Sequence, residues 1–455
     1  MQKQKGGNRL NFPSIDFSWF GNGSVIALIA IIHVVISHGV AIGTIALMVT
    51  MEYRAHRTKN LALDALAKKI AKWVLIITTT MGAMTGVGIW FSTTVIQPDS
   101  IGALLRIFFW AWVAEWIVFI TEVVLLILYY YTWDKWRDGR AKARHIKLGI
   151  VLAFASWMTM AIITGVLAAK LTPGLWVETH AFWNAFINPT YLPSLGFRMF
   201  LAILLAIALL SFFIRWRVKD VALRQEVFHV FGLWGAISLP AVFVLGLWYL
   251  WSIPTDAYDM IVWSTGMPEN VFKTLNGIAF AILIIYLIWM IVKPKAVPWI
   301  LSLIVMGSSV AFIGEFEVVR ESIRKPFIIY DYMYANGLLE ENREKYDEEG
   351  FLKHATWAKE REVTEDNVVD AGREVFIGQC ITCHTVDGWR SKRSLTNRMD
   401  GWTEDDMTSF IPTMHNVRVA MPPFMGTDEE LEALAAYLST EINGKRTNKK
   451  EVSQQ

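Results

Sequence analysis

Cysteine and charge are what this sequence has least of. Only two cysteines, Cys380 and Cys383, occur in 455 residues, which excludes a disulfide framework as the source of stability. Charged residues make up 18% of the chain and the formal net charge is +2, so no electrostatic footprint predicts nucleic acid as a partner. Hydrophobic residues make up 54%, and the mean hydropathy is +0.36. A soluble globular protein is therefore not expected.

Long apolar runs are abundant instead. Crossing a bilayer core of about 30 Å takes roughly 20 helical residues. The sequence therefore predicts an all-α fold, a polytopic membrane bundle of about eight transmembrane helices. The expected helices lie near residues 24–50, 72–96, 103–131, 148–169, 199–214, 227–252, 274–292 and 297–319. After Arg320 the composition becomes charged, so a soluble C-terminal domain is expected beyond the membrane domain.

The orientation follows from lysine and arginine in the short loops, because cytoplasmic loops carry the excess. One set of alternate loops holds 18 of these residues and the other set holds 3. The basic loops are 51–72, 132–147, 215–226 and 293–298. With an even number of spans, both termini are expected outside. The protein is thus predicted in the inner membrane, with its N-terminus and soluble tail on the periplasmic side.

The composition also predicts where the domains begin and end. The expected order is an N-terminal segment, a transmembrane domain, a charged linker, a compact soluble domain and a polar tail. These cover residues 1–23, 24–320, 321–365, 366–443 and 444–455, respectively. The charged stretch has a second interpretation, in which it folds over the site of the soluble domain as a lid.

The strongest chemical motif lies in the soluble region, at Cys380-Ile381-Thr382-Cys383-His384. Two thiols three positions apart suit thioether bonds to the two vinyl groups of one haem, and the adjacent His384 is then the proximal iron ligand. The alternative is a redox dithiol. The motif predicts one covalently attached haem c.

A sixth iron ligand is expected further along the chain. Met421 precedes Pro422 and Pro423, which would hold a thioether on a rigid loop. Met414, Met425 and His415 are nearby alternatives. Met421 is the predicted ligand.

The order of features over 366–443 resembles a class I cytochrome c. A short helix over 371–376 leads into the Cys-His motif, and Thr427-Asp428-Glu429-Glu430 has the pattern of a capping box before an apolar helical stripe. The resemblance implies haem attachment outside the cytoplasm, which agrees with the predicted topology.

Several ionisable residues fall within the apolar runs, where a charge is costly and is a functional candidate. They are His33, His38, Glu115, Glu122, Glu315 and Glu317. Glu115 and Glu122 are two helical turns apart, so they share one face and suit a proton relay or a metal site. His33 and the two late glutamates are expected at a similar depth and suit haem iron. The alternative for all of them is hydrogen bonding between helices.

The membrane half resembles cytochrome bd oxidase subunit I over most of 24–335. The resemblance rests on motifs in a consistent order: His33, Gly43, Met51-Glu52-Tyr53, Gly82-Ala83-Met84-Thr85-Gly86, Glu115, Glu122, Trp133-Asp134-Lys135, Asn188-Pro189 and Arg324-Lys325-Pro326-Phe327. It implies non-covalent haems of b or d type, with His33 and Glu315 as iron ligands. It also implies that Glu115 and Glu122 serve the haem site and supply it with protons. One residue of slip in helix 1 leaves His38 as the alternative ligand.

Two departures from that family concern its low-spin haem. The helix 5 histidine position falls on Arg198, and the methionine expected early in helix 7 is missing, with Asn276 nearby. The large quinol-binding loop is also reduced to about twenty residues near 253–273. The quinol apparatus is therefore expected to be lost, although His229 or His180 could hold a different haem. Arg198 either pairs with a haem propionate or snorkels to the headgroups.

These features together predict a respiratory membrane oxidoreductase. Electrons from a periplasmic electron-transfer protein would enter at haem c and reach membrane haems that reduce oxygen. Two alternatives stay open: quinol oxidation with delivery through haem c, and a non-catalytic haem-bearing anchor subunit. A second membrane subunit is expected, and a residual quinone pocket is not excluded. His56, His145 and His354 are expected in solvated loops without a role.

Overall fold

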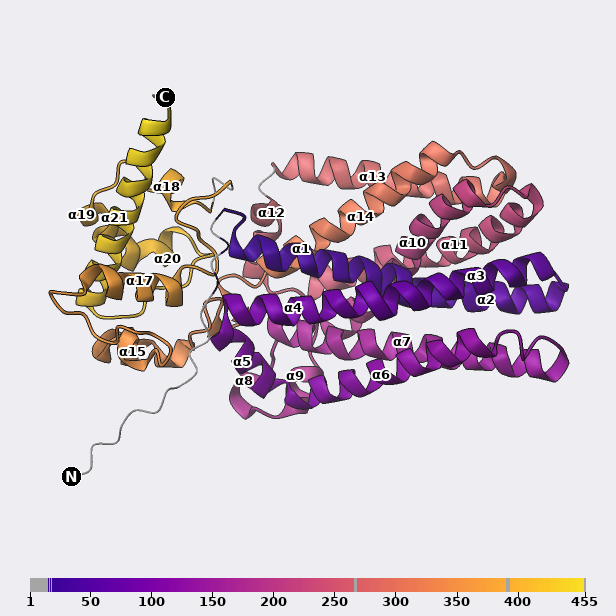
Figure 1. Ribbon diagram of the computed structural model, residues 1–455, viewed down its shortest axis with the longest axis horizontal. Helices are drawn as coiled ribbons and strands as arrows, with labels where there is room; N and C mark the ends of the chain where they lie inside the picture. Colours follow the sequence, from indigo (N-terminus) through magenta and orange to yellow (C-terminus); the bar gives the residue numbers. More distant parts are fainter. Residues whose placement is uncertain (1–14, 16, 18, 266–267, 390–392, 454–455) are drawn as a thin grey trace. The chain divides into compact units, whose positions relative to one another are not determined.

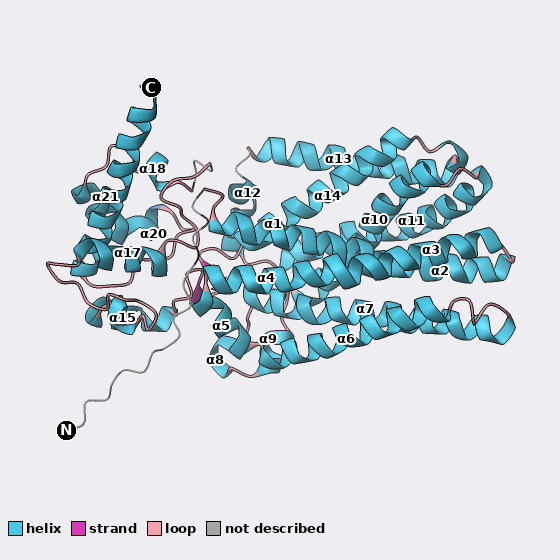
Figure 2. Cartoon of the chain, in the orientation of Figure 1, coloured by secondary structure: helices cyan, strands magenta, loops and turns pink. Residues whose placement is uncertain are grey.

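The computed structural model describes residues 15, 17, 19–265, 268–389 and 393–453. Helices dominate, and one short strand pair is the sheet found in the described residues (Figure 2). The chain forms two compact units. The first, called the membrane unit, comprises Ile29–Gly88 and Ile107–Arg324. The second, called the soluble unit, comprises the described residues of Met1–Leu28, Ile89–Arg106 and Lys325–Gln455. The predicted all-α fold is confirmed.

Eight helices of the described chain are long and apolar enough to span a membrane, as predicted. Short loops join most of them (Figure 1). The π-helical segments η1 and η2 interrupt the first two spans. The elements are α1 (Asn22–Val34), η1 (Val35–Gly43), α2 (Thr44–Thr58), α3 (Leu61–Ile77), η2 (Thr78–Gly82), α4 (Ala83–Ile96), α5 (Pro98–Ile107), α6 (Phe109–Thr132), α7 (Gly139–Leu171), α8 (Trp176–Thr179), α9 (Phe182–Phe186), α10 (Tyr191–Arg217), α11 (Val221–Ser252), α12 (Thr255–Thr265), α13 (Glu269–Val292), η3 (Pro294–Ala296) and α14 (Trp299–Ser322).

Small residues allow the membrane helices to approach closely. A Cβ at Gly43 would lie 2.1 Å from the carbonyl oxygen of Ala202, so the first span presses directly on the backbone of α10. A Cβ at Gly149 of α7 would lie 2.8 Å from the ring of Tyr129 on α6. These glycines set the helix contacts that position the polar side chains of the bundle.

The remaining elements lie beyond the last span. They are β1 (Phe327–Ile329), β2 (Met333–Tyr334), η4 (Glu340–Asn342), α15 (Arg343–Glu349), α16 (Phe351–His354), α17 (Val368–Gln379), α18 (Leu395–Arg398), α19 (Glu404–Phe410), η5 (Ile411–Thr413), α20 (Met414–Val417) and α21 (Asp428–Ser453). Helices α17 and α21 pack together around one apolar core. Their closest approach is at Gly372, where a Cβ would lie 1.9 Å from the carbonyl oxygen of Ala433.

The stretch predicted as a charged linker is folded and contributes to this core. Phe351 and Leu352 of α16 are buried in it, and a Cβ at Gly378 would lie 2.3 Å from the ring of Phe351. The Glu430 carboxylate accepts hydrogen bonds from the backbone N–H groups of Phe351 (2.8 Å) and Leu352 (2.7 Å). Glu430 also bonds reciprocally with Thr427, which confirms the predicted capping box. One carboxylate therefore ties α16 to the start of α21.

Replacing Gly372 by alanine should destabilise the soluble unit. The new methyl group has no space against the Ala433 carbonyl, and overpacking of this kind costs about 1–3 kcal/mol. The expected result is a lower unfolding midpoint, measured by thermal circular dichroism on the purified full-length protein. The matched control is Gly444→Ala in α21, where no atom lies within 4 Å of the added Cβ. An unchanged midpoint for Gly372→Ala would contradict the packing of α17 on α21.

Candidate functional site

A cavity of about 1000 Å³, including its opening to solvent, lies within the soluble unit. Apolar side chains and a few polar groups line it, as expected for a large flat ligand. The lining residues are Gln379, Cys380, His384, Leu395, Arg398, Met399, Trp402, Phe410, Ile411, Met414, Val417, Arg418, Met421, Phe424, Leu434 and Leu438. None of the described residues of 321–365 lines this cavity.

The Cys-His motif forms a tight turn at the end of α17. The His384 N–H donates to the Cys380 carbonyl at 2.9 Å, which returns the chain toward the cavity. On the imidazole, Nδ1 donates to the Arg393 carbonyl at 3.2 Å. This bond sets the tautomer and leaves the Nε2 lone pair for a metal. Burial and the nearby Arg393 charge lower the pKa of His384 to about 4, so the ring is neutral at physiological pH.

The Cys380 side chain lines the cavity, and Cys383 follows three positions later in the same turn. Burial, with the neighbouring Cys383, raises the pKa of the Cys380 thiol to about 12. A thiol with so high a pKa is a poor nucleophile in exchange reactions. This environment disfavours the redox dithiol and suits haem attachment.

Three methionines line the cavity: Met399, Met414 and Met421. Met425 is fully buried and lies outside the lining, where its backbone pairs with the Gln379 side chain at 2.6 and 3.1 Å. His415 also lies outside the lining, and its Nδ1 donates to the Met421 carbonyl at 2.7 Å. Two of the alternatives to Met421 therefore hold the loop rather than face the cavity. The sequence did not single out Met399, because no rigid loop or motif marks it.

The first turn of α1 contacts the Cys-His motif from outside the cavity. The Asn22 side-chain amide donates to the Ile381 carbonyl at 3.1 Å, and the contact is buried. The Trp389 indole N–H donates to the Phe20 carbonyl at 3.0 Å. No local sequence signal predicts these contacts, because they join segments more than 350 residues apart.

In the membrane unit, His33 of α1 is held through one ring nitrogen. Its Nδ1 lies 3.1 Å from the hydroxyl oxygen of Thr85, and that hydroxyl donates its own proton to the Met81 carbonyl at 2.7 Å. His33 Nδ1 therefore donates to Thr85, and the Gly82 carbonyl also bonds the ring. The hydrogen bonds found among the described residues include none at Nε2. Gly86 makes room for the ring, because a Cβ there would lie 3.1 Å from His33 Cε1.

His38, the alternative ligand, lies in η1 and is occupied by a charged group. Its Nε2 accepts from Arg198 Nη1 at 3.3 Å, while Arg198 Nη2 contacts Glu317 Oε1 at 3.4 Å. Glu317 is also paired with Arg320 at 2.9 Å. Arg198 is 3% exposed, so the expectation that it snorkels to the headgroups is wrong. The arginine uses the His38 lone pair that a metal would need.

Glu315 of α14 accepts a hydrogen bond from the Asn276 amide at 3.2 Å. Helix α14 meets α1 nearby, because a Cβ at Gly314 would lie 3.8 Å from the Ile31 side chain. The structure thus brings together the helices that carry His33 and Glu315. The contact lies two residues from His33 on α1 and one residue from Glu315 on α14.

The two helix 3 carboxylates lie on α6, seven positions apart on one face. Glu122 is 9% exposed and accepts from the Thr159 hydroxyl of α7 at 3.2 Å. Glu115 is half-buried. These residues belong to the α6–α7 pair, whereas His33 and Glu315 belong to α1 and α14.

His145 was expected in a solvated loop, and this is wrong. It lies in the first two turns of α7 with no exposed surface, and its Nδ1 lies 2.6 Å from Glu52 Oε1. Helix α7 begins at Gly139, nine residues before the predicted span, which carries His145 into the bundle. The only sequence signal was Glu52 itself, an acidic residue in a largely apolar segment that needs a partner.

The comparisons with known proteins divide along the chain. Residues 367–438 match the family model of cytochrome c oxidase, cbb3-type, subunit III. The bd oxidase from Geobacillus thermodenitrificans is a similar solved structure, with a TM-score of 0.53 and 15% sequence identity, covering 69% of this chain and 89% of that one. No curated protein matches this chain in sequence. The chain therefore joins a membrane region with the fold of a bd oxidase to a C-terminal cytochrome c domain.

Proposed function

We propose that this protein is a respiratory haem oxidoreductase in which electrons enter at the C-terminal cytochrome c domain and reduce oxygen at a haem in the membrane unit. Haem iron supplies one-electron transfer and, where an axial position is open, oxygen binding. The observation that carries the proposal is the state of His33. Thr85 orients its ring through Nδ1 and leaves Nε2 free.

The proposed cytochrome c domain covers residues 366–443 and holds one haem c. Cys380 and Cys383 would attach it, and His384, through Nε2, and Met421 would be the ligands of its iron. The free Nε2 of His384 and the place of Met421 in the cavity lining support these roles. Arg398 and Arg418 also line the cavity and suit the haem propionates.

The membrane haem, of b or d type, is proposed to lie between His33 and Glu315. His38 is a weaker candidate because its Nε2 accepts from Arg198. Glu317 is likewise committed to Arg198 and Arg320. Glu115 and Glu122 are proposed to deliver protons, since reduction of one oxygen molecule to two waters consumes four electrons and four protons.

Electron entry through haem c is favoured over entry from quinol by two positions. Arg198 fills the place of the expected low-spin haem ligand and is locked between His38 and Glu317. Asn276, near the place of the missing methionine, bonds to Glu315. In the membrane unit, Arg198 and Asn276 therefore make polar contacts with neighbouring side chains and do not serve as haem ligands. This supports electron entry through haem c and not from quinol.

The proposed location is the inner membrane, with the cytochrome c domain on the periplasmic side. The support is the distribution of lysine and arginine, which concentrates in the loops expected to be cytoplasmic. A periplasmic electron-transfer protein is the proposed donor, and a second membrane subunit is a proposed partner.

Changing both Cys380 and Cys383 to alanine should abolish covalent haem. Thioether attachment needs the two sulfur atoms, so the 51.8 kDa band should lose its haem stain on a denaturing gel. Membrane insertion, followed by fractionation, should be unchanged. Covalent haem that survives both substitutions would overturn the assignment.

Met421→Ala should keep the covalent haem but lower its reduction potential, because a soft thioether ligand favours ferrous iron. Redox titration of the purified protein measures the potential. Met414→Ala is the matched control, since Met414 lines the same cavity. If the potential falls for Met414→Ala and not for Met421→Ala, the ligand is Met414.

His33→Ala should remove a non-covalent haem, measured by pyridine haemochrome, and stop oxygen uptake with reduced cytochrome c. The soluble domain should still be reduced by the donor. His38→Ala is the comparison, and it should retain that haem. A His33 variant with all its haems would show that this histidine is structural. Wild type that reduces cytochrome c with quinol, yet never consumes oxygen with reduced cytochrome c, would show the opposite electron direction.

A further inference from the structure

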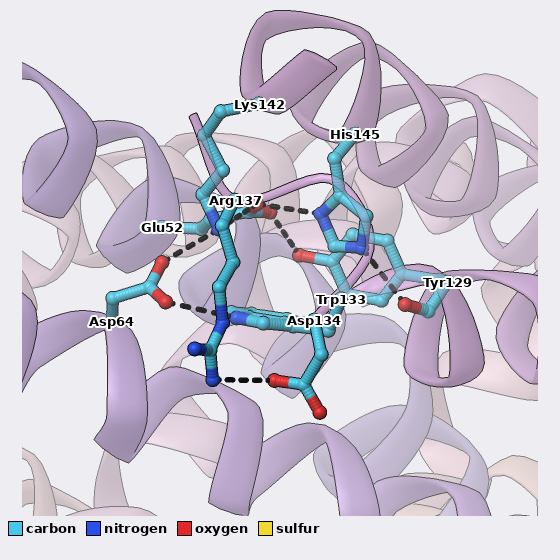
Figure 3. Close-up of polar contacts among 8 residues, drawn as sticks. All are labelled: Glu52, Asp64, Tyr129, Trp133, Asp134, Arg137, Lys142 and His145. Carbon is cyan, nitrogen blue, oxygen red and sulfur yellow. Dashed lines mark hydrogen bonds and ion pairs between the residues drawn. The ribbon is translucent and has the colours of Figure 1, made fainter. Parts of the chain in front are cut away.

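A buried cluster of charged side chains joins four helices of the membrane unit (Figure 3). Glu52 of α2 is its centre and has no exposed surface. Its Oε1 lies 2.7 Å from Lys142 Nζ and 2.6 Å from His145 Nδ1, both on α7. Its Oε2 accepts from the Tyr129 hydroxyl of α6 at 2.5 Å. Asp64 of α3 completes the cluster, 2.6 Å from Lys142 Nζ.

The contacts of His145 determine its protonation state. Nδ1 faces the Glu52 carboxylate, and Nε2 lies 2.8 Å from the Tyr129 backbone carbonyl. A carbonyl can only accept, so Nε2 carries a proton. Glu52 also accepts from the Tyr129 hydroxyl and forms an ion pair with Lys142, so Nδ1 faces an acceptor as well. Both ring nitrogens of His145 therefore face acceptors, the arrangement that an imidazolium requires.

The charges that face His145 balance. Lys142 and His145 are positive, and Glu52 and Asp64 are negative. The Trp133 indole N–H donates to Asp64 at 2.9 Å. The Lys142 ammonium also forms a cation–π contact with the Trp133 ring, 4.5 Å from the ring centroid. Two pairs of opposite charges in contact can stay buried, whereas a single unpaired charge cannot.

The cluster lies on the same helix face as the proposed proton carriers. Glu115, Glu122 and Tyr129 recur every seven residues along α6, so Tyr129 is about 10 Å from Glu122 along the helix axis. On α7, Glu122 interacts with the buried hydroxyl of Ser156 as well as with Thr159, and Ser156 is about one turn nearer to His145 than Thr159 is. The polar contacts of Glu122 therefore extend toward the cluster.

Two leucines occupy the remaining distance. Leu126 of α6 is 2% exposed and Leu152 of α7 has no exposed surface. Proton transfer past these apolar side chains would require transient hydration, so the cluster and Glu122 are separate sites.

We propose that Glu52 and His145 form a proton-holding site that supplies Glu122 during the reaction proposed above, on which this inference rests. One proton leaves His145 Nδ1 through Glu52 and crosses by water to the Glu122 carboxylate, leaving a neutral imidazole. A proton from the cytoplasmic water restores the imidazolium. Four such transfers, with four electrons from the cytochrome c donor, convert one oxygen molecule to two waters.

The competing role is purely structural, an ionic contact that fastens α2, α3, α6 and α7. Both roles predict a loss of stability when a partner is removed, because a buried charge is left uncompensated. Only the proton-holding role predicts slower turnover in a protein that has kept its fold and haems.

The test uses the full-length protein with its haems, with oxygen uptake driven by reduced cytochrome c. Glu52→Gln and His145→Gln should each lower turnover at least about tenfold. This threshold is conservative, because a positioned proton donor typically contributes about a hundredfold or more. Haem content per protein should stay at the wild-type value, and the solvent deuterium isotope effect should rise. Glu122→Gln should slow turnover in the same way.

The matched control is Asp134→Asn. Asp134 lies beside the cluster and pairs with Arg137 at 2.8 Å, but its side chain is 53% exposed (Figure 3). Its loss should leave turnover within about twofold of wild type, because an exposed pair contributes little. If Glu52→Gln or His145→Gln keeps its haems and turns over at the control rate, the proton-holding role is wrong.

A wild-type measurement protects the test against variants that do not fold. Infrared spectroscopy of wild type with ring-labelled histidine should show a buried imidazolium at pH 7. Its signal is assigned by comparison with His145→Gln. If that variant does not fold, hydrogen–deuterium exchange of the exposed histidines separates the buried signal. A neutral His145 would overturn the proposal without any turnover assay. If wild type shows the imidazolium but consumes no oxygen with reduced cytochrome c, the proposed function fails, and with it this role for the cluster. Active wild type with equally active variants overturns the cluster's role alone.

Discussion

The cost of burying charge among apolar helices governs the polar architecture of the membrane unit. A lone charge inside such a bundle costs several kcal/mol, so each charged group needs partners on neighbouring helices. Arg198 meets this requirement with His38 and Glu317, and Glu52 meets it with Lys142, His145 and Tyr129. These contacts bind together helices whose apolar faces alone leave their mutual rotation weakly specified.

The same constraint separates candidate ligands from structural residues. A histidine can bind iron only when one ring nitrogen keeps its lone pair, and the partners of the ring decide this. Thr85 accepts a hydrogen bond from Nδ1 of His33, so that Nε2 is available to a metal. Arg198 instead donates to His38. Among acidic residues the logic is similar: Glu317 is neutralised by arginines, whereas Glu315 accepts from a neutral amide.

The sequence predicted the features that depend on local pattern. The eight spans follow from hydropathy, and the Cys380–His384 motif and the Thr427 cap follow from spacing within one turn. It did not predict contacts that depend on the register of distant helices. His145 is buried because α7 begins nine residues earlier than its apolar run suggests. The charged stretch after Arg320 packs because Phe351 fills the space left by Gly378, a relation that composition does not reveal.

The two ionic clusters have different chemical capacities, although both are buried. In the Arg198 cluster, the guanidinium groups keep their charge at any physiological pH, so Glu317 is permanently neutralised and no proton is available to move. In the Glu52 cluster, one direct partner of the carboxylate is the imidazole of His145, a side chain that can gain and lose a proton under physiological conditions. Replacing an arginine by a histidine in such a cluster turns a fixed charge into a transferable proton. The first cluster can therefore hold helices in place, whereas the second can also take part in the proton supply that oxygen reduction demands.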